Sequence, residues 1–285
     1  MSKFLATIVM LGAGVGGVSF AAEDSLPGDQ LYPVKIYFTE NVKSALSLDP
    51  ESDANTEAAK IGKRLEEAGK LALKGRLSQN IADKLDAQFQ KHLQKMSEIA
   101  DKLEEQGKLE AANQIRSRLE SILIAHEEIL QEITENALTR PEIKEIVAKV
   151  KNQIQTQFAD NEELRIRIED KLRSKIGPAV QTAAEGKLSA AENKLDEVES
   201  FVEKKSDTLS PEAKMKIDAA ITAARNAITD GKTKLNSEQY AEAFLLFQKS
   251  IALSQQAKIM AAIHSELAEQ DLETDNNELE DNGGE

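Results

Sequence analysis

The segment from Ile81 to Ile133 reads IADKLDAQFQKHLQKMSEIADKLEEQGKLEAANQIRSRLESILIAHEEILQEI. Before Gly107, apolar residues and one histidine recur at steps of three and four, and the same spacing resumes after it. This spacing places them along one face of each of two helices, with Gly107 at the turn. The segment therefore predicts a helical hairpin with coiled-coil-like packing. The residues expected in its seam are Ala82, Leu85, Phe89, His92, Met96, Ile99 and Leu103, then Ala112, Ile115, Leu119, Ile122, His126, Ile129 and Ile133.

The composition predicts the same class for the whole chain of 285 residues. Apolar residues make up 40% of it, but aromatic residues only 4%, and tryptophan is absent. A core must therefore be built from aliphatic side chains, as in helical bundles, and the low proline and glycine content argues against a turn-rich β protein. We expect an all-α protein, a long-helix bundle of coiled-coil hairpins arranged in two helical units.

The formal net charge of −14 narrows the range of partners. A protein that binds nucleic acid must offset phosphate charge with a basic face, and this sequence has no basic surplus. We therefore expect no nucleic-acid partner, and anionic membrane surfaces are disfavoured for the same reason. The absence of cysteine excludes disulfides, thiolate metal sites, a cysteine nucleophile and a lipid-modified cysteine.

Residues 1–21 have the three-part layout of a secretory signal peptide. Lys3 provides a short basic start, an apolar run extends from Phe4 to Val18, and small residues lead to an expected cleavage site after Ala21. We therefore expect an extracytoplasmic protein, either periplasmic or secreted. No later apolar run approaches the length of a membrane span, so we expect no membrane anchor.

The same region carries a rival pattern, that of a dinucleotide-binding protein. Gly12, Gly14 and Gly17 have the spacing G-x-G-x-x-G, and Glu40 stands where a ribose-binding carboxylate would follow a second strand. However, the next Pro-Gly pair would interrupt the crossover helix, and no further strand pattern follows to complete a parallel sheet. The signal peptide is the favoured interpretation, and we expect no cofactor.

A compact motif follows the leader, where residues 26–35 read LPGDQLYPVK. The Pro-Gly pair indicates a turn, and the second proline suits the first position of a helix. The motif resembles the start of a bacterial exported domain of unknown function, recognised by Leu-Pro-Gly-Asp-x-Leu-Tyr-Pro-x-Lys. We expect the resemblance to extend from Asp24 to Leu138. The matching residues are Leu26, Pro27, Gly28, Asp29, Leu31, Tyr32, Pro33 and Lys35.

The resemblance implies an extracytoplasmic helical domain without assigned catalysis. Some members of that family accompany envelope-signalling regulators, and many are membrane-tethered, whereas no tether is expected in this chain. The resemblance supplies no active-site residues.

His92 and His126 are the chemically distinctive residues of the hairpin seam. With the turn at Gly107, residue 92 lies opposite residue 122, about one helical turn from His126. One interpretation is a shared metal site or an acid-sensitive contact, and the other is a pair of hydrogen-bonded core histidines that set helix register. Because two histidines without a third ligand make a poor zinc site, we predict no metal and keep these two as the only candidates.

A further helix precedes the hairpin, from Asp49 and Pro50 to Leu73. Gly62 and Gly69 lie on its inner side, one heptad apart. Glycine within a helix costs about 1 kcal/mol relative to alanine. Close approach of another helix and a weak, frayed helix are the two explanations that remain open.

Proline at 141 and the Gly-Pro pair at 177–178 mark the expected boundaries between helices in the rest of the chain. Asp160 followed by Glu163 resembles a capping pair, so the segment after Pro141 is either one helix or two. This segment either bridges two units or completes the first. The expected divisions are a signal peptide at 1–21, the family-like helical domain at 24–140, the bridging helix or helices at 141–177, a three-helix unit at 178–272 and a disordered acidic tail at 273–285.

In the three-helix unit we expect helices at about 179–205, 211–229 and 237–270. A hairpin around Gly231 is similar to one tetratricopeptide-type unit, but related sequences elsewhere in the chain do not recur at a fixed period. A repeat array is therefore not expected.

No catalytic motif is present: the sequence lacks G-x-S-x-G, H-E-x-x-H and a phosphate-binding loop. We expect a non-catalytic protein that acts in the cell envelope or outside it by presenting helix faces to a protein partner. Two alternatives remain. One is a pH- or metal-responsive envelope sensor that uses His92 and His126, and the other is a coiled coil that assembles with copies of itself.

Overall fold

The computed structural model describes residues 25–36, 49–135, 140–175 and 177–281. The regular elements within these ranges are all helices, which confirms the expected all-α class. The expected signal peptide and Glu40 lie outside the described residues. The elements are α2 (Tyr32–Val34), α4 (Pro50–Leu73), α5 (Gln79–Glu105), α6 (Leu109–Glu135), α7 (Pro141–Arg173), α8 (Pro178–Lys205), the short 3₁₀ helix η2 (Ser206–Thr208), α9 (Pro211–Asn236) and α10 (Tyr240–Asp281).

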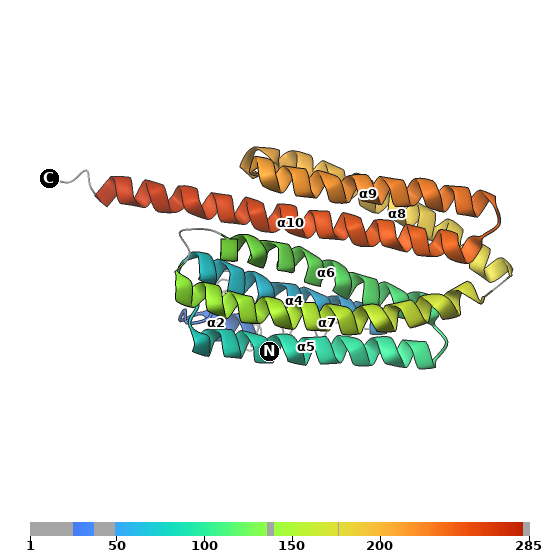
Figure 1. Cartoon of the computed structure of the whole chain (residues 1–285), viewed down its shortest axis with the longest axis horizontal. Helices are drawn as coiled ribbons and strands as arrows, with labels where there is room; N and C mark the ends of the chain where they lie inside the picture. The colour runs from blue at the N-terminus through green and yellow to red at the C-terminus, as the bar shows by residue number, and fades with distance from the viewer. Residues whose placement is uncertain (1–24, 37–48, 136–139, 176, 282–285) are drawn as a thin grey trace, which may run out of the picture.

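Helices α4 to α7 form a bundle, the lower layer in Figure 1. Within it, α5 and α6 form the predicted hairpin. Gly107 joins them with a φ of 72°, a left-handed conformation that glycine adopts without strain. The amide of Lys108 donates to the carbonyl of Leu103 at 2.9 Å and closes the end of α5. All the expected seam residues are buried except His92, which is partly exposed, so the hairpin prediction is confirmed.

Helix α4 is continuous through Gly62 and Gly69, which rules out fraying as the explanation for these glycines. Both glycines face α6. A β-carbon on Gly62 would lie 3.9 Å from Cε1 of His126, and one on Gly69 would lie 3.8 Å from Cδ1 of Ile133. These are ordinary van der Waals distances, so α4 lies close to α6 but with room for a methyl group.

The segment after Pro141 is one helix, α7, and it completes the bundle. Asp160 and Glu163 lie inside this helix and do not divide it. Helix α7 packs along α6 and also contacts α5. The buried side chain of Asn161 donates to the carbonyl of Arg116 on α6 at 3.0 Å. The alternative of a bridge between two units is therefore not what the structure shows.

Helices α8, α9 and α10 form the second unit, the upper layer in Figure 1. Helix α8 is continuous across its internal glycine. Helix α9 differs from expectation, because it continues through Gly231 to Asn236. The turn lies at residues 237–239 instead, where Glu238 has a φ of 60°. Gly231 marks a close contact with Phe247 of α10 and not a turn.

The two units meet where α10 lies over α6, as Figure 1 shows. Polar contacts connect them towards both ends of α6. Lys216 Nζ on α9 lies 2.7 Å from Glu132 Oε1 on α6. Lys187 Nζ on α8 donates to Gln114 Oε1 on α6 at 2.9 Å. Helix α6 therefore belongs to the core of the first unit and is also the face on which the second unit rests.

Helix α10 is described as far as Asp281, so the expected acidic tail at 273–285 overlaps its end. The side chains at this end, and residues 282–285, lie outside the described part of the chain. Among the helices that are described, none is both long enough and apolar enough to cross a membrane.

Candidate functional site

The motif at residues 26–35 begins with a turn that docks on the first bundle. The Asp29 carboxylate accepts a hydrogen bond from the amide of Leu26 at 2.8 Å and pairs with Arg76 Nη2 at 2.7 Å. The hydrogen bond from Arg76, assisted by the Leu26 amide, lowers the pKa of Asp29. Gly28 between them has a φ of 102°, which side chains other than glycine rarely adopt. Leu26 is buried, so the turn inserts an apolar side chain into the core.

Tyr32 and Lys35 fix the motif to α4. The hydroxyl of Tyr32 donates to Glu67 Oε2 at 3.0 Å and accepts from Arg64 Nη1 at 2.8 Å. Lys35 Nζ lies 2.7 Å from Glu67 Oε1 and donates to the carbonyl of Ser25 at 3.0 Å. Two side chains of the motif therefore reach one carboxylate of α4, Glu67, and Tyr32 also binds Arg64 of the same helix.

The other motif residues shape the backbone between these contacts. Pro27 is buried, and Pro33 lies in the first turn of α2, where the amide that proline lacks is not needed. The carbonyl of Leu31 accepts the amide of Lys35 at 3.2 Å. The contacts of the motif are therefore those of an N-terminal segment docked on the bundle.

Helix α4 carries a row of buried charges that the motif completes. Glu57, Lys60, Arg64 and Glu67 follow one another at steps of three, four and three, so they share one face of the helix. None of them is more than 7% exposed. Arg64 Nη1 also donates to Gln88 Oε1 of α5 at 2.7 Å. Burial raises the pKa of Glu67, although its cationic neighbours oppose the rise.

Glu57 is the centre of the other half of this row. Its Oε1 accepts from Lys60 at 3.1 Å and from Lys95 of α5 at 3.0 Å, and its Oε2 lies 2.6 Å from His92 Nδ1. Burial would raise the pKa of Glu57, but these hydrogen bonds outweigh it and lower the pKa to about 2. A carboxylate held this firmly in its ionised form cross-links helices and is poorly suited to exchanging protons.

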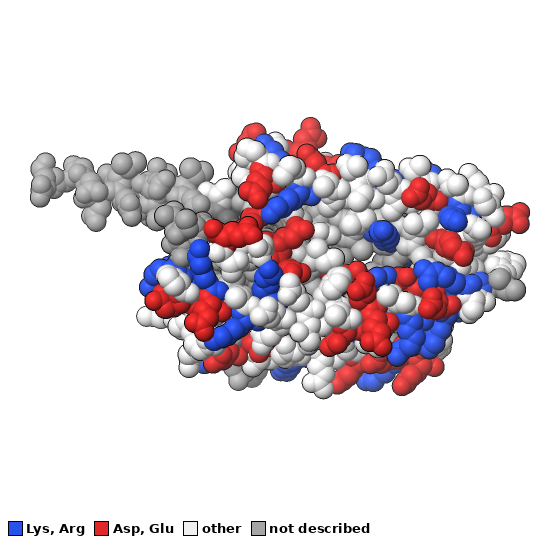
Figure 2. All heavy atoms as spheres, in the orientation of Figure 1, with Lys and Arg blue, Asp and Glu red and all other residues white. Residues whose placement is uncertain are grey.

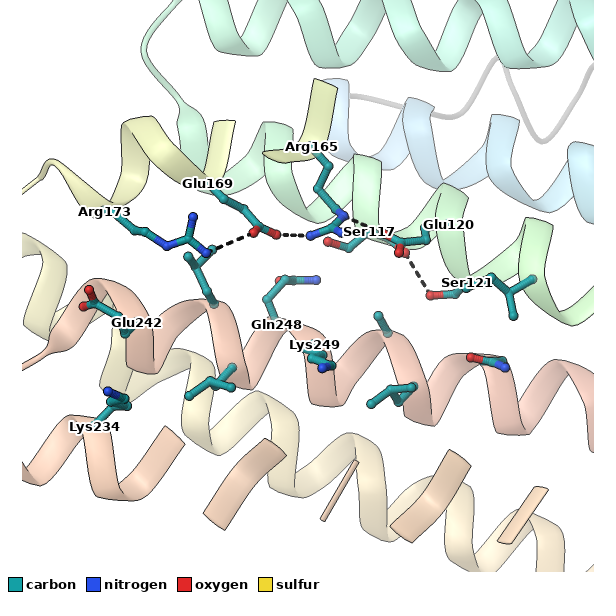
Figure 3. A pocket seen from close by; sticks show the side chains of 16 residues that line it. Ser117, Glu120, Ser121, Arg165, Glu169, Arg173, Lys234, Glu242, Gln248 and Lys249 are labelled. Atoms are coloured by element: carbon teal, nitrogen blue, oxygen red, sulfur yellow. Dashed lines mark hydrogen bonds and ion pairs between the residues drawn. The ribbon is translucent and has the colours of Figure 1, made fainter. Parts of the chain in front are cut away.

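A cleft of about 480 Å³ lies between the two units and is drawn in Figure 3. Its wall on α6 and α7 is a row of ion pairs. Arg165 Nε lies 2.6 Å from Glu120 Oε2, Arg165 also pairs with Glu169, and Glu169 lies 3.4 Å from Arg173. Burial raises the pKa of Glu120, while Arg165 opposes the rise. Figure 3 shows these four side chains in line along the cleft.

The opposite wall of the cleft is formed by α10. Gln248 is only 3% exposed, and its Oε1 has no hydrogen-bond partner among the described residues. Lys249 makes no ion pair within the part of the chain that the structure describes. The apolar residues of this wall are Leu245, Leu246, Ala252 and Leu253.

Residues 24–171 match a known family, described as Domain of unknown function (DUF5667). The match covers just over half of the 285 residues. This chain belongs to the DUF5667 family. Comparison with curated proteins and with solved structures found no match.

The extent of the DUF5667 match corrects the expected limit of the resemblance. The match continues past Leu138 to residue 171, close to the end of α7 at Arg173. It therefore takes in α4 to α7, the helices that pack as the first bundle. The second unit begins at Pro178, outside the match. The cleft thus lies between the DUF5667 domain and a unit that the family match does not include.

His92 and His126 have separate partners in the DUF5667 domain. His92 pairs with Glu57, whereas the buried His126 donates from Nδ1 to the Ile122 carbonyl of its own helix at 2.8 Å. Burial lowers the pKa of His126 to about 4, against the opposing effect of the backbone of Ile122 and Gly62. Among the described residues, no group of three or more His, Asp or Glu side chains is placed to hold a metal.

Sequence reasoning missed the buried charges of the DUF5667 domain. Glu57, Lys60, Arg64 and Glu67 do have helical spacing, but alternating charges at such spacing are typical of a solvated helix face. The sequence did contain one signal of their burial, because these charges lie next to the inward apolar residues of α4. A helix with charges on its inner side needs polar partners from other segments. Those partners come from the motif and from α5, both distant in sequence.

Proposed function

We propose that this DUF5667 protein is exported and acts outside the cytoplasm, without catalysis, by holding a segment of a partner protein in the cleft between its two units. Export is supported by the sequence of residues 1–21. Binding is supported by one observation above the others, namely that the walls of the cleft come from different units. Helices α6 and α7 of the DUF5667 domain form one wall, and α10 forms the other.

The chemistry of the cleft suits a protein segment. Leu245 and Leu253 give the α10 wall an apolar surface, while Lys249 and Glu242 have no ion pairs with described residues. Apolar anchors with a few polar groups around them are typical of grooves that receive amphipathic segments. Acidic and basic side chains both line the cleft, so its chemistry does not favour a strongly charged partner of either sign.

The polar groups of the ion-paired wall support binding more than they support a reaction. Glu120 and Glu169 are both engaged by Arg165. The hydroxyl of Ser121 donates to the carbonyl of Ser117 at 2.8 Å. An activated serine needs a base within hydrogen-bonding distance, and no histidine is among the described residues that line the cleft. The groups in the cleft therefore fit a surface that recognises a partner.

Site-specific photo-crosslinking tests the binding part of the proposal. A crosslinking residue at position 253 replaces Leu253 in the cleft, and a matched control at position 215 replaces Met215 of α9, which is 66% exposed and not among the cleft-lining residues. We expect a protein adduct in the envelope fraction from position 253 alone. An adduct with a second copy of the chain would favour the self-assembling alternative, and equal adducts from both positions would rule out the cleft.

N-terminal sequencing tests the export part separately. Protein recovered from the periplasm or the medium should begin at Ala22, because cleavage is expected after Ala21. Protein found only in the cytoplasm and still beginning at Met1 would contradict export. That result would leave the crosslinking outcome as an independent measurement.

A further inference from the structure

Arg118 on α6 has no partner among the described residues, whereas every other arginine of the chain has one. The nearby Arg116, for example, donates to Asp101 at 2.7 Å. Arg118 makes no hydrogen bond or ion pair with any described residue, and its Nε is fully buried. Burial lowers the pKa of Arg118, and no neighbouring carboxylate opposes the shift. An unpaired guanidinium held partly out of water is costly, so its persistence requires a physical reason.

Arg118 lines a second cleft, of about 580 Å³, between α6, α8 and α10. This cleft adjoins the first one at Ser121 and Gln248, which line both. All three helices contribute basic side chains, and no acidic side chain is among the described residues that line it. The basic side chains are Arg118 of α6, Lys187 and Lys194 of α8, and Lys258 of α10.

Two of these basic side chains share a single carboxylate. Lys194 and Lys258 both pair with the same carboxylate, Glu197, which lies outside the lining. Lys187 donates to Gln114, which also lines the cleft. Because one acidic side chain serves two cations, the positive charge centred on Arg118 is not balanced by that carboxylate.

The same cleft also has an apolar side. Ile251 and Ile259 of α10 are among the residues that line it. Alanines of α8 and α10, at positions 190, 252 and 262, add small apolar surface. A ligand that fills this space therefore meets both a guanidinium and apolar side chains.

We propose that this cleft binds a small organic anion, whose carboxylate or phosphate group pairs with Arg118 and whose short hydrocarbon part lies against Ile251 and Ile259. A guanidinium offers two parallel N–H donors that match such oxyanions. The volume of the cleft falls within the range of small-molecule sites, about 300 to 1,000 Å³. The proposal does not depend on a partner segment in the first cleft.

The charge of the whole protein favours a small anion over a large polyanion. With a net charge of −14, the chain repels nucleic acids and anionic membranes at long range. Figure 2 shows acidic side chains spread among basic ones over the visible face of both units. Within the cleft, a ligand of a few carbons lies closer to the basic side chains than the Debye length of about 8 Å. These nearby cations therefore determine its electrostatic energy more than the distant acidic surface does.

Calorimetric titration of the full chain with hexanoate, hexyl phosphate and hexanol tests this proposal. We expect saturable binding of at least one anion and none of hexanol, and the anion that binds identifies carboxylate or phosphate as the recognised group. Arg118→Gln should weaken that binding at least about tenfold, through loss of a charge-assisted pair. The matched control is Arg225→Gln on α9, which removes the same charge from an exposed pair with Glu199 and should bind as the wild type does. Failure of both anions to bind, or equal affinity in Arg118→Gln, would overturn the proposal.

The unfolding temperature provides a second readout. If Arg118 only supported packing, its replacement would lower this temperature. Without ligand, Arg118→Gln should unfold at the same temperature as the wild type or higher, because it removes an unpaired and partly buried charge. Addition of the binding anion should raise the unfolding temperature of the wild type and leave that of the variant unchanged. A lower unfolding temperature for the variant, with no anion effect on the wild type, would show that Arg118 only supports packing.

Discussion

The ring of Phe247 on α10 packs against the backbone of α9 at Gly231. A β-carbon on residue 231 would lie 2.7 Å from Cδ1 of this ring, closer than real side chains approach. Phe247 is completely buried, so the ring has no adjacent solvent to move into. Glycine at this position is therefore what allows α9 and α10 to pack together at their present distance.

We predict that Gly231→Ala lowers the free energy of unfolding by about 1 to 3 kcal/mol, although alanine is the better helix former, because the methyl group overpacks the contact with Phe247. Urea denaturation measures the change. Gly186→Ala in α8 is the matched control, since nothing lies within 4 Å of its β-carbon. This control should raise stability by up to about 1 kcal/mol. A gain in both variants would show that the α9–α10 contact can relax.

Tyr32→Phe tests the fastening of the motif to α4. The substitution removes the hydroxyl that serves both Arg64 and Glu67, whose side chains are buried. Each loses a hydrogen-bond partner where water does not readily replace it. We expect the free energy of unfolding to fall by about 1 to 3 kcal/mol in urea denaturation.

Tyr240→Phe is the control for this substitution. Tyr240 is partly buried against the core, and its hydroxyl makes no hydrogen bond with the described residues. The same chemical change there should alter stability by less than about 0.5 kcal/mol. Equal losses in the two variants would mean that ring packing, and not the hydroxyl network, holds the motif.

The seam of the α5–α6 hairpin was predictable because local spacing alone determines it. Leu85, Phe89 and Met96 are buried as their steps of three and four require. Gly231 shows where such reasoning stops. A glycine near the end of a periodic segment ordinarily marks a helix terminus, but here its role is set by Phe247 on the next helix.

The candidate sites were not predictable for a related reason. Both clefts exist because α10 packs against α6, and no local pattern in either helix encodes that contact. Arg118 illustrates this. In sequence it is one basic residue among the charges of α6. It is distinctive only because no described carboxylate lies within its reach.

The carboxylates of Glu57 and Glu197 both have a pKa that is lowered to about 2, but they differ in burial. The side chain of Glu57 is 1% exposed, whereas that of Glu197 is 48% exposed. We predict that Glu57→Gln lowers the free energy of unfolding by about 3 to 5 kcal/mol, because the buried Lys60 loses its anion, and the half-exposed Lys95 loses one of its two carboxylates.

Glu197→Gln is the matched control, and it should cost less than about 1 kcal/mol, because water screens its pairs. Urea denaturation at neutral pH measures the stability change in both variants. The stabilisation that comes from a lowered carboxylate pKa is fully present above the ordinary value of 4.5, and it is lost as the pH falls towards 2. Similar losses in the two variants would contradict the view that burial decides the strength of the Glu57 cluster.

His126 makes the fold sensitive to acid in a pH range that can be stated in advance. Its pKa is about 4 in the folded protein, lowered by burial from an ordinary value of 6.5. Between these values the unfolded chain binds the proton more strongly, so the contribution of His126 to stability is complete above pH 6.5 and decreases as the pH falls to about 4. At 1.36 kcal/mol per pH unit, the loss attributable to this residue is about 3 kcal/mol.

His126→Leu should therefore lose less stability than the wild type between pH 6.5 and pH 4, as measured by urea denaturation at each pH. The informative quantity is the difference in stability loss between the variant and the wild type. Burial raises the pKa of Glu67, so Glu67 increases stability as the pH falls, and it does so in both proteins. The burial of His264, which lowers its pKa, acts in the same direction as that of His126 and is also common to both. If the stabilities of the variant and the wild type fall in parallel over this range, the imidazole of His126 is not shielded from protons as its burial beside Gly62 and Ile122 requires.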